Sequence, residues 1–156
     1  MNQLDGRILR SQKSQNLILD AIIKLINNGN LYPTAQEVAK ESGIAIRTVF
    51  RQFADMESLL MKVDELINEK LLNEESYINM SLSLSERLKK IIDERVYFYN
   101  KYENIMIATV TQLPKYKILQ KRYPEYQKLL RKRTEEIIPE ILSLKSNSQE
   151  LLDATL

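Results

Sequence analysis

The side chains that most often carry enzyme chemistry are missing from this sequence. Its 156 residues include no His and no Cys, so the commonest general base and the thiolate and imidazole metal ligands are absent. The acidic pairs Glu74-Glu75 and Glu135-Glu136 point in diverging directions on a helix, with no Glu-x-x-His partner. We therefore expect no enzyme, no metal site and no cofactor.

Polar and basic side chains are concentrated between residues 34 and 53, where the spacing is typical of a helix-turn-helix. Ala39 is small where two short helices must cross closely. Gly43, four residues later, can adopt the positive φ of a turn. Val49 returns the second helix to the core that contains Val38. The second helix then keeps other faces for bases and phosphates.

The predicted DNA contacts lie on this second helix, at the start of the first, and in the N-terminal segment. They are Thr34, Ala45, Arg47, Thr48, Phe50, Arg51 and Gln52, together with Arg10 and Lys13; Arg7 belongs to the same N-terminal arm. A lone arginine on a helix is more often a solvated charge, but the surrounding motif favours a DNA contact at Arg47 and Arg51.

The elements around the motif are all expected to be helical. Thr34 and Glu37, three residues apart, predict a capping box, and Asp55 can cap the helix that follows the motif. Asn28-Gly29 offers a left-handed stop to the first helix. Apolar residues at helical spacing predict helices at about 11–28, 34–42, 45–52 and 55–75.

The second half of the chain is also expected to be helical. The polar stretch Ser76 to Ser85 separates it from the first half. A long helix is expected to about residue 102 and a shorter one through 105–110. Pro124 is predicted to open a further helix, which Pro139 should kink or shorten. A last helix is predicted to begin at Ser148.

The residue order from Thr34 to Leu59 resembles the N-terminal domain of the TetR family of transcriptional repressors, and the likeness covers about residues 10 to 65. Farther on, two segments look like the seventh helix of family members. The quoted segments are Thr34, Glu37-Val38-Ala39, Ser42-Gly43-Ile44-Ala45, Thr48-Val49-Phe50-Arg51-Gln52-Phe53, Glu57-Ser58-Leu59, Leu129-Leu130-Arg131 and Ile138-Pro139-Glu140-Ile141-Leu142.

The resemblance implies an all-α homodimer that binds a palindromic DNA operator and leaves it when a small-molecule effector enters the C-terminal domain. We accordingly expect a helix-turn-helix DNA-binding domain at 1–52 and a ligand-binding and dimerisation domain at 53–156, with a connecting helix at about 55–75. Family members usually finish with two long helices, and this sequence stops inside what looks like the first, so a shortened C-terminus is expected.

Aromatic side chains with a polar tip are frequent in the second half, where they suit the wall of a ligand cavity. Plain core packing is the competing interpretation for each of them. The candidate pocket residues are Tyr97, Tyr99, Tyr102, Met106 and Tyr126. Leu151, Leu152 and Leu156 share an apolar helix face and are the candidate dimer contacts.

Two further interpretations remain open. The basic cluster Arg131-Lys132-Arg133 suits a second nucleic-acid surface, although the interspersed Glu125, Glu135 and Glu136 favour a solvated face. The whole chain suits a helical protein-interaction module without sequence-specific DNA binding, since the net charge is only +2. We see no signal peptide and no membrane span, and expect a cytoplasmic protein.

Overall fold

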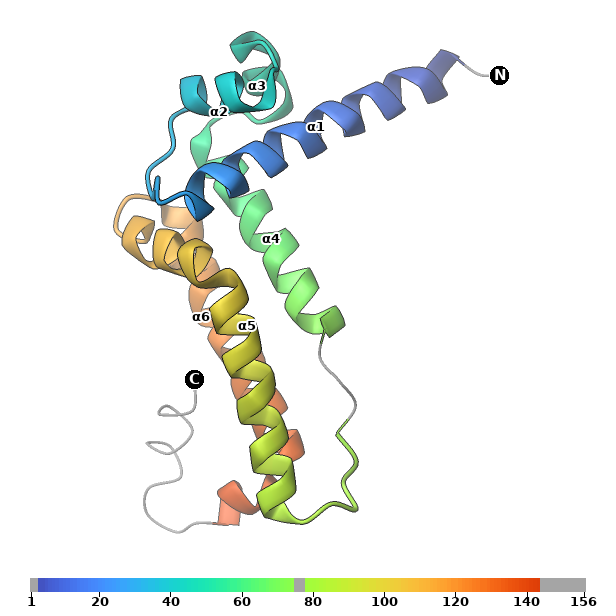
Figure 1. Ribbon diagram of the computed structural model, residues 1–156, viewed down its shortest axis with the longest axis vertical. Coiled ribbons are helices and arrows are strands. Elements are labelled where there is room, and N and C mark those ends of the chain that lie inside the picture. The colour runs from blue at the N-terminus through green and yellow to red at the C-terminus, as the bar shows by residue number, and fades with distance from the viewer. Residues whose placement is uncertain (1–2, 75–77, 144–156) are drawn as a thin grey trace. The chain divides into compact units, whose positions relative to one another are not determined.

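The computed structural model describes residues 3–74 and 78–143, and this part of the chain is helical without any strand (Figure 1). The predicted all-α class is confirmed. The elements are α1 (Gln3–Asn27), α2 (Ala35–Ser42), α3 (Ile46–Gln52), α4 (Met56–Glu74), α5 (Leu84–Gln112), α6 (Lys117–Ile137) and the 3-10 helix η1 (Pro139–Ser143).

The chain forms two compact units that do not follow a single cut in the sequence. Unit 1 contains Met1–Ile67 and Tyr102–Leu119, and unit 2 contains Asn68–Lys101 and Gln120–Leu156. In α5 the division falls at Tyr102, whose φ of −116° and ψ of 16° interrupt the helical geometry. The sequence predicted one helix to about residue 102 and a second through 105–110, and two helical segments do meet at this kink. The predicted domain boundary after residue 52 stays a prediction.

Unit 1 is built around the C-terminal half of α1. Ile18, Ile22 and Ile26 recur at helical spacing and are almost fully buried. The buried side chains of Val38 in α2 and Val49 in α3 add to this core. Figure 1 shows α2 and α3 beside α1. Burying each such side chain stabilises the fold by about 1.5–3 kcal/mol, so this packing fixes how α3 is presented.

Local signals in the sequence set the ends of these helices. Thr34 Oγ1 accepts a hydrogen bond from Glu37 N, and Thr34 N donates to Glu37 Oε2 at 2.7 Å, which is the predicted capping box. Gly43 ends α2 with φ of 67°. Ser58 N donates to Asp55 Oδ1 at 2.7 Å, as expected for the cap of α4. The start and end of α2 and the cap of α4 therefore lie where the residue types predict.

Long-range hydrogen bonds join the C-terminal half of α5 and the start of α6 to the rest of unit 1. Asn104 Nδ2 donates to the carbonyl oxygen of Asn27 at 3.1 Å, at the end of α1. The buried Gln112 donates through Nε2 to the carbonyl oxygen of Leu31 at 2.9 Å. Each bond satisfies a backbone carbonyl at the end of α1 or in the segment that connects α1 to α2.

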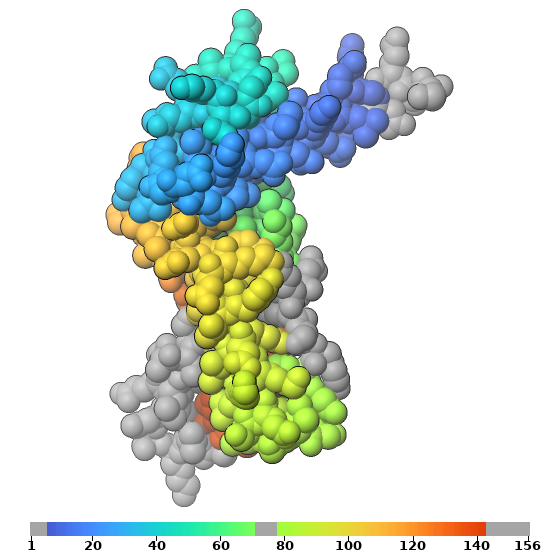
Figure 2. Space-filling model, in the orientation of Figure 1, coloured from blue at the N-terminus to red at the C-terminus, as the bar shows by residue number. Residues whose placement is uncertain are grey.

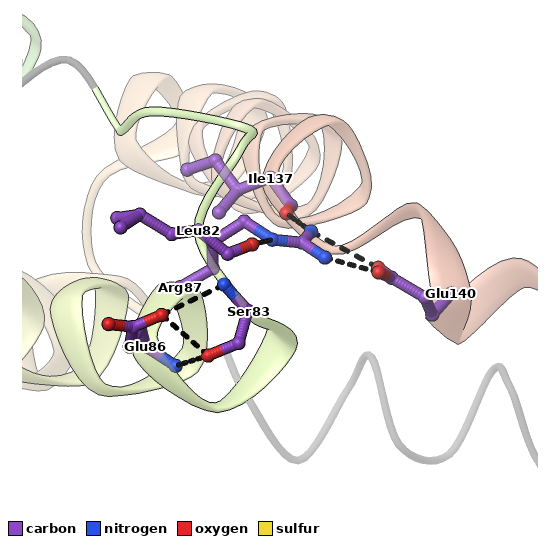
Figure 3. Close-up of polar contacts among 6 residues, drawn as sticks. All are labelled: Leu82, Ser83, Glu86, Arg87, Ile137 and Glu140. Carbon is purple, nitrogen blue, oxygen red and sulfur yellow. Dashed lines mark hydrogen bonds and ion pairs between the residues drawn. The ribbon is translucent and has the colours of Figure 1, made fainter.

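In unit 2, the first turn of α5 is held to the end of α6 by Arg87 (Figure 3). This buried side chain donates to the carbonyl oxygens of Leu82 and Ile137 and forms an ion pair with Glu140. The pair holds the pKa of the Glu140 carboxyl below its usual range, chiefly through the hydrogen bond from Arg87. Arg87 thus serves as a tertiary cap for the carboxyl end of α6.

Apolar packing surrounds this polar contact. Ile78, Ile91, Ile137 and Ile138 form a buried cluster, against which Leu88 and Ile141 pack. Farther along the same helices, Arg133 Nη2 donates to Glu94 Oε2 at 3.1 Å, and Arg95 donates to the buried Thr134 hydroxyl. These contacts align α5 with α6 within unit 2.

Two of the predicted helix boundaries were wrong. Pro124 does not open a helix but lies inside α6, which starts at Lys117. The start was missed because its cap is distant in sequence: Ile118 N donates to Glu57 Oε1 at 2.9 Å. The first helix starts at Gln3, well before the expected residue 11. Pro139 ends α6 as predicted, since α6 stops at Ile137 and a 3-10 helix follows. The predicted helix from Ser148 lies outside the described residues.

Candidate nucleic-acid interface

The exposed side of α3 consists of two parallel rows of side chains. Arg47 and Arg51 lie one turn apart and are exposed, and Ile46 and Phe50 form the adjacent row. Val49 is buried on the opposite side, against the core of unit 1. Because Val49 fixes the rotation of α3 about its own axis, these two rows are the surface that α3 offers to a partner.

A concavity of about 660 Å³ lies between the N-terminal half of α1 and the turn that leads into α3. Figure 2 shows the dark-blue turns of α1 and the cyan segment of α3 on its two sides. Its lining contains three arginines and no acidic residue. The lining residues are Arg7, Arg10, Ser11, Ser14, Gly43, Ile44, Ala45, Thr48, Arg51 and Gln52.

The arginines of this region differ from the other arginines of the chain. Arg7, Arg10, Arg47 and Arg51 form no ion pair with any side chain of the described residues, whereas each of the remaining arginines has an interaction partner. An arginine that pairs with no carboxylate of its own chain can bind an anion from outside the chain.

One hydrogen bond crosses the concavity wall and joins α1 to the end of α3. Ser11 Oγ donates to Gln52 Oε1 at 3.1 Å. Because Oε1 accepts this bond, the side chain of Gln52 can offer its amide NH₂ as a donor to a partner. Ser11 lies on the same face of α1 as Arg7 and Ser14, at spacings of three and four residues. From this i, i+4, i+7 spacing of polar residues, the sequence could have predicted that α1 forms one wall of the concavity.

The structure brings most of the predicted DNA contacts to this region. Ala45, Arg47, Phe50 and Arg51 are exposed on α3 or at its start, and Thr48 and Gln52 are half-buried in the concavity wall. Arg10 lines the concavity from α1, whereas Lys13 is exposed on α1 without lining it. The prediction did not include Ser11, Ser14, Ile44 or Ile46, and it placed Arg7 in the arm without counting it among the contacts.

Thr34 lies apart from this concavity and has a local partner. Its hydroxyl and backbone amide both bond to the Glu37 carboxylate, which lowers the pKa of that carboxyl. The structure therefore assigns Thr34 a cap at the start of α2, and whether it also contacts DNA stays a prediction.

The candidate pocket residues divide between the two units. Tyr102 and Met106 belong to unit 1, where Tyr102 is buried at the kink of α5. Tyr97, Tyr99 and Tyr126 belong to unit 2. Burial raises the pKa of the half-buried Tyr99 hydroxyl, and the nearby positive charge of Arg95 opposes that rise. A ligand pocket formed by these residues remains a prediction.

The basic segment of α6 is interlaced with acids, as the solvated-face interpretation expects. Arg133 pairs with Glu94 of α5, and Lys132 Nζ lies 3.7 Å from Glu136 Oε1. This differs from the arginines of α1 and α3. The candidate dimer contacts Leu151, Leu152 and Leu156 lie outside the described residues.

Comparison with known proteins gives no family for this chain. No protein-family model matches it, and no curated protein matches it. Within the described helices, none combines the length and apolarity that a bilayer crossing requires. Among the same residues, no group of three or more acidic side chains is close enough together to hold a metal ion.

Proposed function

We propose that this chain is a ligand-responsive transcriptional regulator of the TetR type, a repressor that binds a palindromic operator as a homodimer and is released by a small-molecule effector. The observation that carries the proposal is a set of four arginines, on α3 and on the N-terminal half of α1, that form no ion pair within the described part of the chain. Burial of Val49 against the core orients Arg47 and Arg51 on α3, and α1 carries Arg7 and Arg10.

In this proposal α3 enters the major groove of duplex DNA. Arg47 and Arg51 approach base edges and phosphates, where a guanidinium can bind guanine O6 and N7 together. Arg7 and Arg10 neutralise the backbone phosphates that pass along the concavity. Phosphate contacts set the position of the protein on the duplex, and base contacts select the sequence.

Release by an effector requires a connection between the DNA-binding helices and the elements beyond them. Within unit 1, α4 begins four residues after α3 ends, and Glu57 of α4 accepts a hydrogen bond from Ile118 N at the start of α6. An effector that displaces α4 or α6 would therefore move α3. A dimer reads half-sites roughly 34–36 Å apart, so a small change in α3 separation breaks the match.

The test is selection of bound sequences from a pool of random duplexes, followed by a salt titration of the selected site. We expect a palindromic consensus and an affinity that falls with salt at a slope near −0.9 per phosphate neutralised. An exposed apolar row on α3, Ile46 and Phe50, favours the second candidate, a helical protein-interaction module. That module would yield no enriched sequence and no steep salt dependence.

A further inference from the structure

The exposed face of α3 carries an apolar row that the arginine chemistry does not use. Ile46 is 40% exposed and Phe50 is 48% exposed, although both are large and apolar. They lie one helical turn apart, and neither lines the concavity between α1 and α3. Arg47 and Arg51 form the neighbouring row along the same helix.

The partner of this face must satisfy both rows at once. It must offer negative charge to unpaired guanidinium groups and apolar surface to Ile46 and Phe50. The major groove of DNA has both features, since phosphates flank it and the 5-methyl group of thymine projects into it. Cytosine carries only a hydrogen in place of this methyl group, and beside it presents an amino donor that an aliphatic or phenyl side chain would leave without a hydrogen bond.

We propose that the Ile46 and Phe50 row recognises thymine through its 5-methyl group, so that each operator half-site contains a required thymine beside the bases or phosphates bound by Arg47 and Arg51. The inference rests on the proposed function, because it names the feature of DNA that the same helix reads. Apolar contact removes the methyl group from water and selects thymine over cytosine and over uracil.

The first experiment changes only the DNA. The operator selected by the wild-type chain is resynthesised with each thymine replaced singly by deoxyuridine, which lacks the 5-methyl group alone. Binding is measured by fluorescence anisotropy at fixed salt. We expect at least one thymine per half-site whose replacement weakens binding by about fourfold, the effect of removing one buried methyl group. The other replacements should leave affinity unchanged.

The second experiment assigns the methyl contact to the protein. In Ile46→Ala or Phe50→Ala, the penalty for deoxyuridine at the contacted thymine should fall from about fourfold to none. Ile92→Ala is the matched control, because Ile92 is also an exposed isoleucine, on α5 in unit 2; it should keep the full penalty. Ile46 and Phe50 are exposed, so thermal unfolding of these variants should match that of the wild type.

Three results would overturn the inference while leaving the proposed function intact. They are an enriched operator without a fixed thymine, a wild-type chain that binds every deoxyuridine duplex equally, and a penalty that persists in both alanine variants. Failure to enrich any sequence would instead reject the proposed function, and the thymine contact with it.

Discussion

At the scale of single residues, the chemistry of this chain depends on which arginines have partners. Arg87 and Arg133 are engaged by Glu140 and Glu94 and hold helices together. Arg47 and Arg51 lie on a helix whose opposite side is buried, and no carboxylate of residues 3–74 or 78–143 pairs with them. The same residue type therefore has a structural role in unit 2 and a surface role in unit 1, and only the contacts distinguish the two.

The roles of Arg47 and Thr48 can be separated by substitution. Arg47→Ala should cost about 1–3 kcal/mol on the selected operator and relax base preference at one position, since a bidentate guanine contact is lost. Thr48 is half-buried in the wall of the concavity, along which the proposal places backbone phosphates. Thr48→Ala should therefore weaken binding to all sequences alike, because a phosphate contact carries no sequence information. Binding to the operator and to single-base variants measures both effects. Wild-type affinity in both variants would show that α3 does not dock through this face.

At the scale of elements, the capping box is expected to make the stability of α2 sensitive to acid. The hydrogen bonds from Thr34 lower the pKa of the folded Glu37 carboxyl. The stabilisation they give is present above the pKa of the unfolded chain and is lost as the pH falls through the lower, folded value. The change therefore begins near the ordinary glutamate pKa of about 4.3 and extends to lower pH.

Two variants test this expectation. Glu37→Gln should be less stable than the wild type at pH 7, and the difference should shrink as the pH falls below about 4. Thr34→Ala should cost about 1 kcal/mol at pH 7 through loss of the cap. Urea unfolding at a series of pH values provides the measurement. A difference between Glu37→Gln and wild type that is constant from pH 7 to pH 3 would contradict the assigned role of the carboxylate.

In unit 2, we expect the contact of Arg87 with Glu140 to stabilise the packing of α5 on α6. Glu140→Gln should lower the unfolding temperature, because the guanidinium stays buried with its charge less compensated. Arg87→Lys should also lower it, since an ammonium cannot reproduce the three-sided contact with Leu82, Ile137 and Glu140.

The control for the Arg87 contact is Lys89→Met, which breaks the exposed pair of Lys89 and Asp93. Such a surface pair contributes about 0–1 kcal/mol, so its loss should change the unfolding temperature little. Circular dichroism on heating compares the three variants. If Glu140→Gln and Lys89→Met both unfold at the wild-type temperature, the Arg87 contact does not hold α5 to α6.

At the scale of the whole molecule, the proposed operator requires two copies of the chain. One helix-turn-helix unit alone binds DNA with near non-specific strength. From the sequence, Leu151, Leu152 and Leu156 are the predicted contacts between copies, and they lie outside the described residues. We expect reversible dimerisation through them.

Sedimentation at several concentrations tests this assembly. The double substitution Leu151→Ser and Leu152→Ser should shift the chain toward monomer and weaken operator binding in parallel. Leu142→Ser is the matched control, because Leu142 is an exposed leucine of η1; it should leave dimerisation unchanged. A wild-type chain that stays monomeric at high concentration would remove the basis for symmetric operator recognition.

The sequence by itself determined the elements whose signals are local. The capping box at Thr34 and Glu37, the turn at Gly43 and the cap at Asp55 each act within a few residues, and all three were predicted correctly. The face of α3 that carries Arg47 and Arg51 was predicted for the same reason, since burial of Val49 fixes the helix rotation.

Only the tertiary structure decided the features that depend on distant partners. The start of α6 is capped by Glu57, 61 residues away, so no local residue marked it. The burial of Arg87 depends on Ile137 and Glu140. That Arg47 and Arg51 have no ion-pair partner among the described residues is likewise a property of the folded unit. Local patterns record backbone preference and periodicity, whereas the partner of a long polar side chain is set by which segments folding brings together.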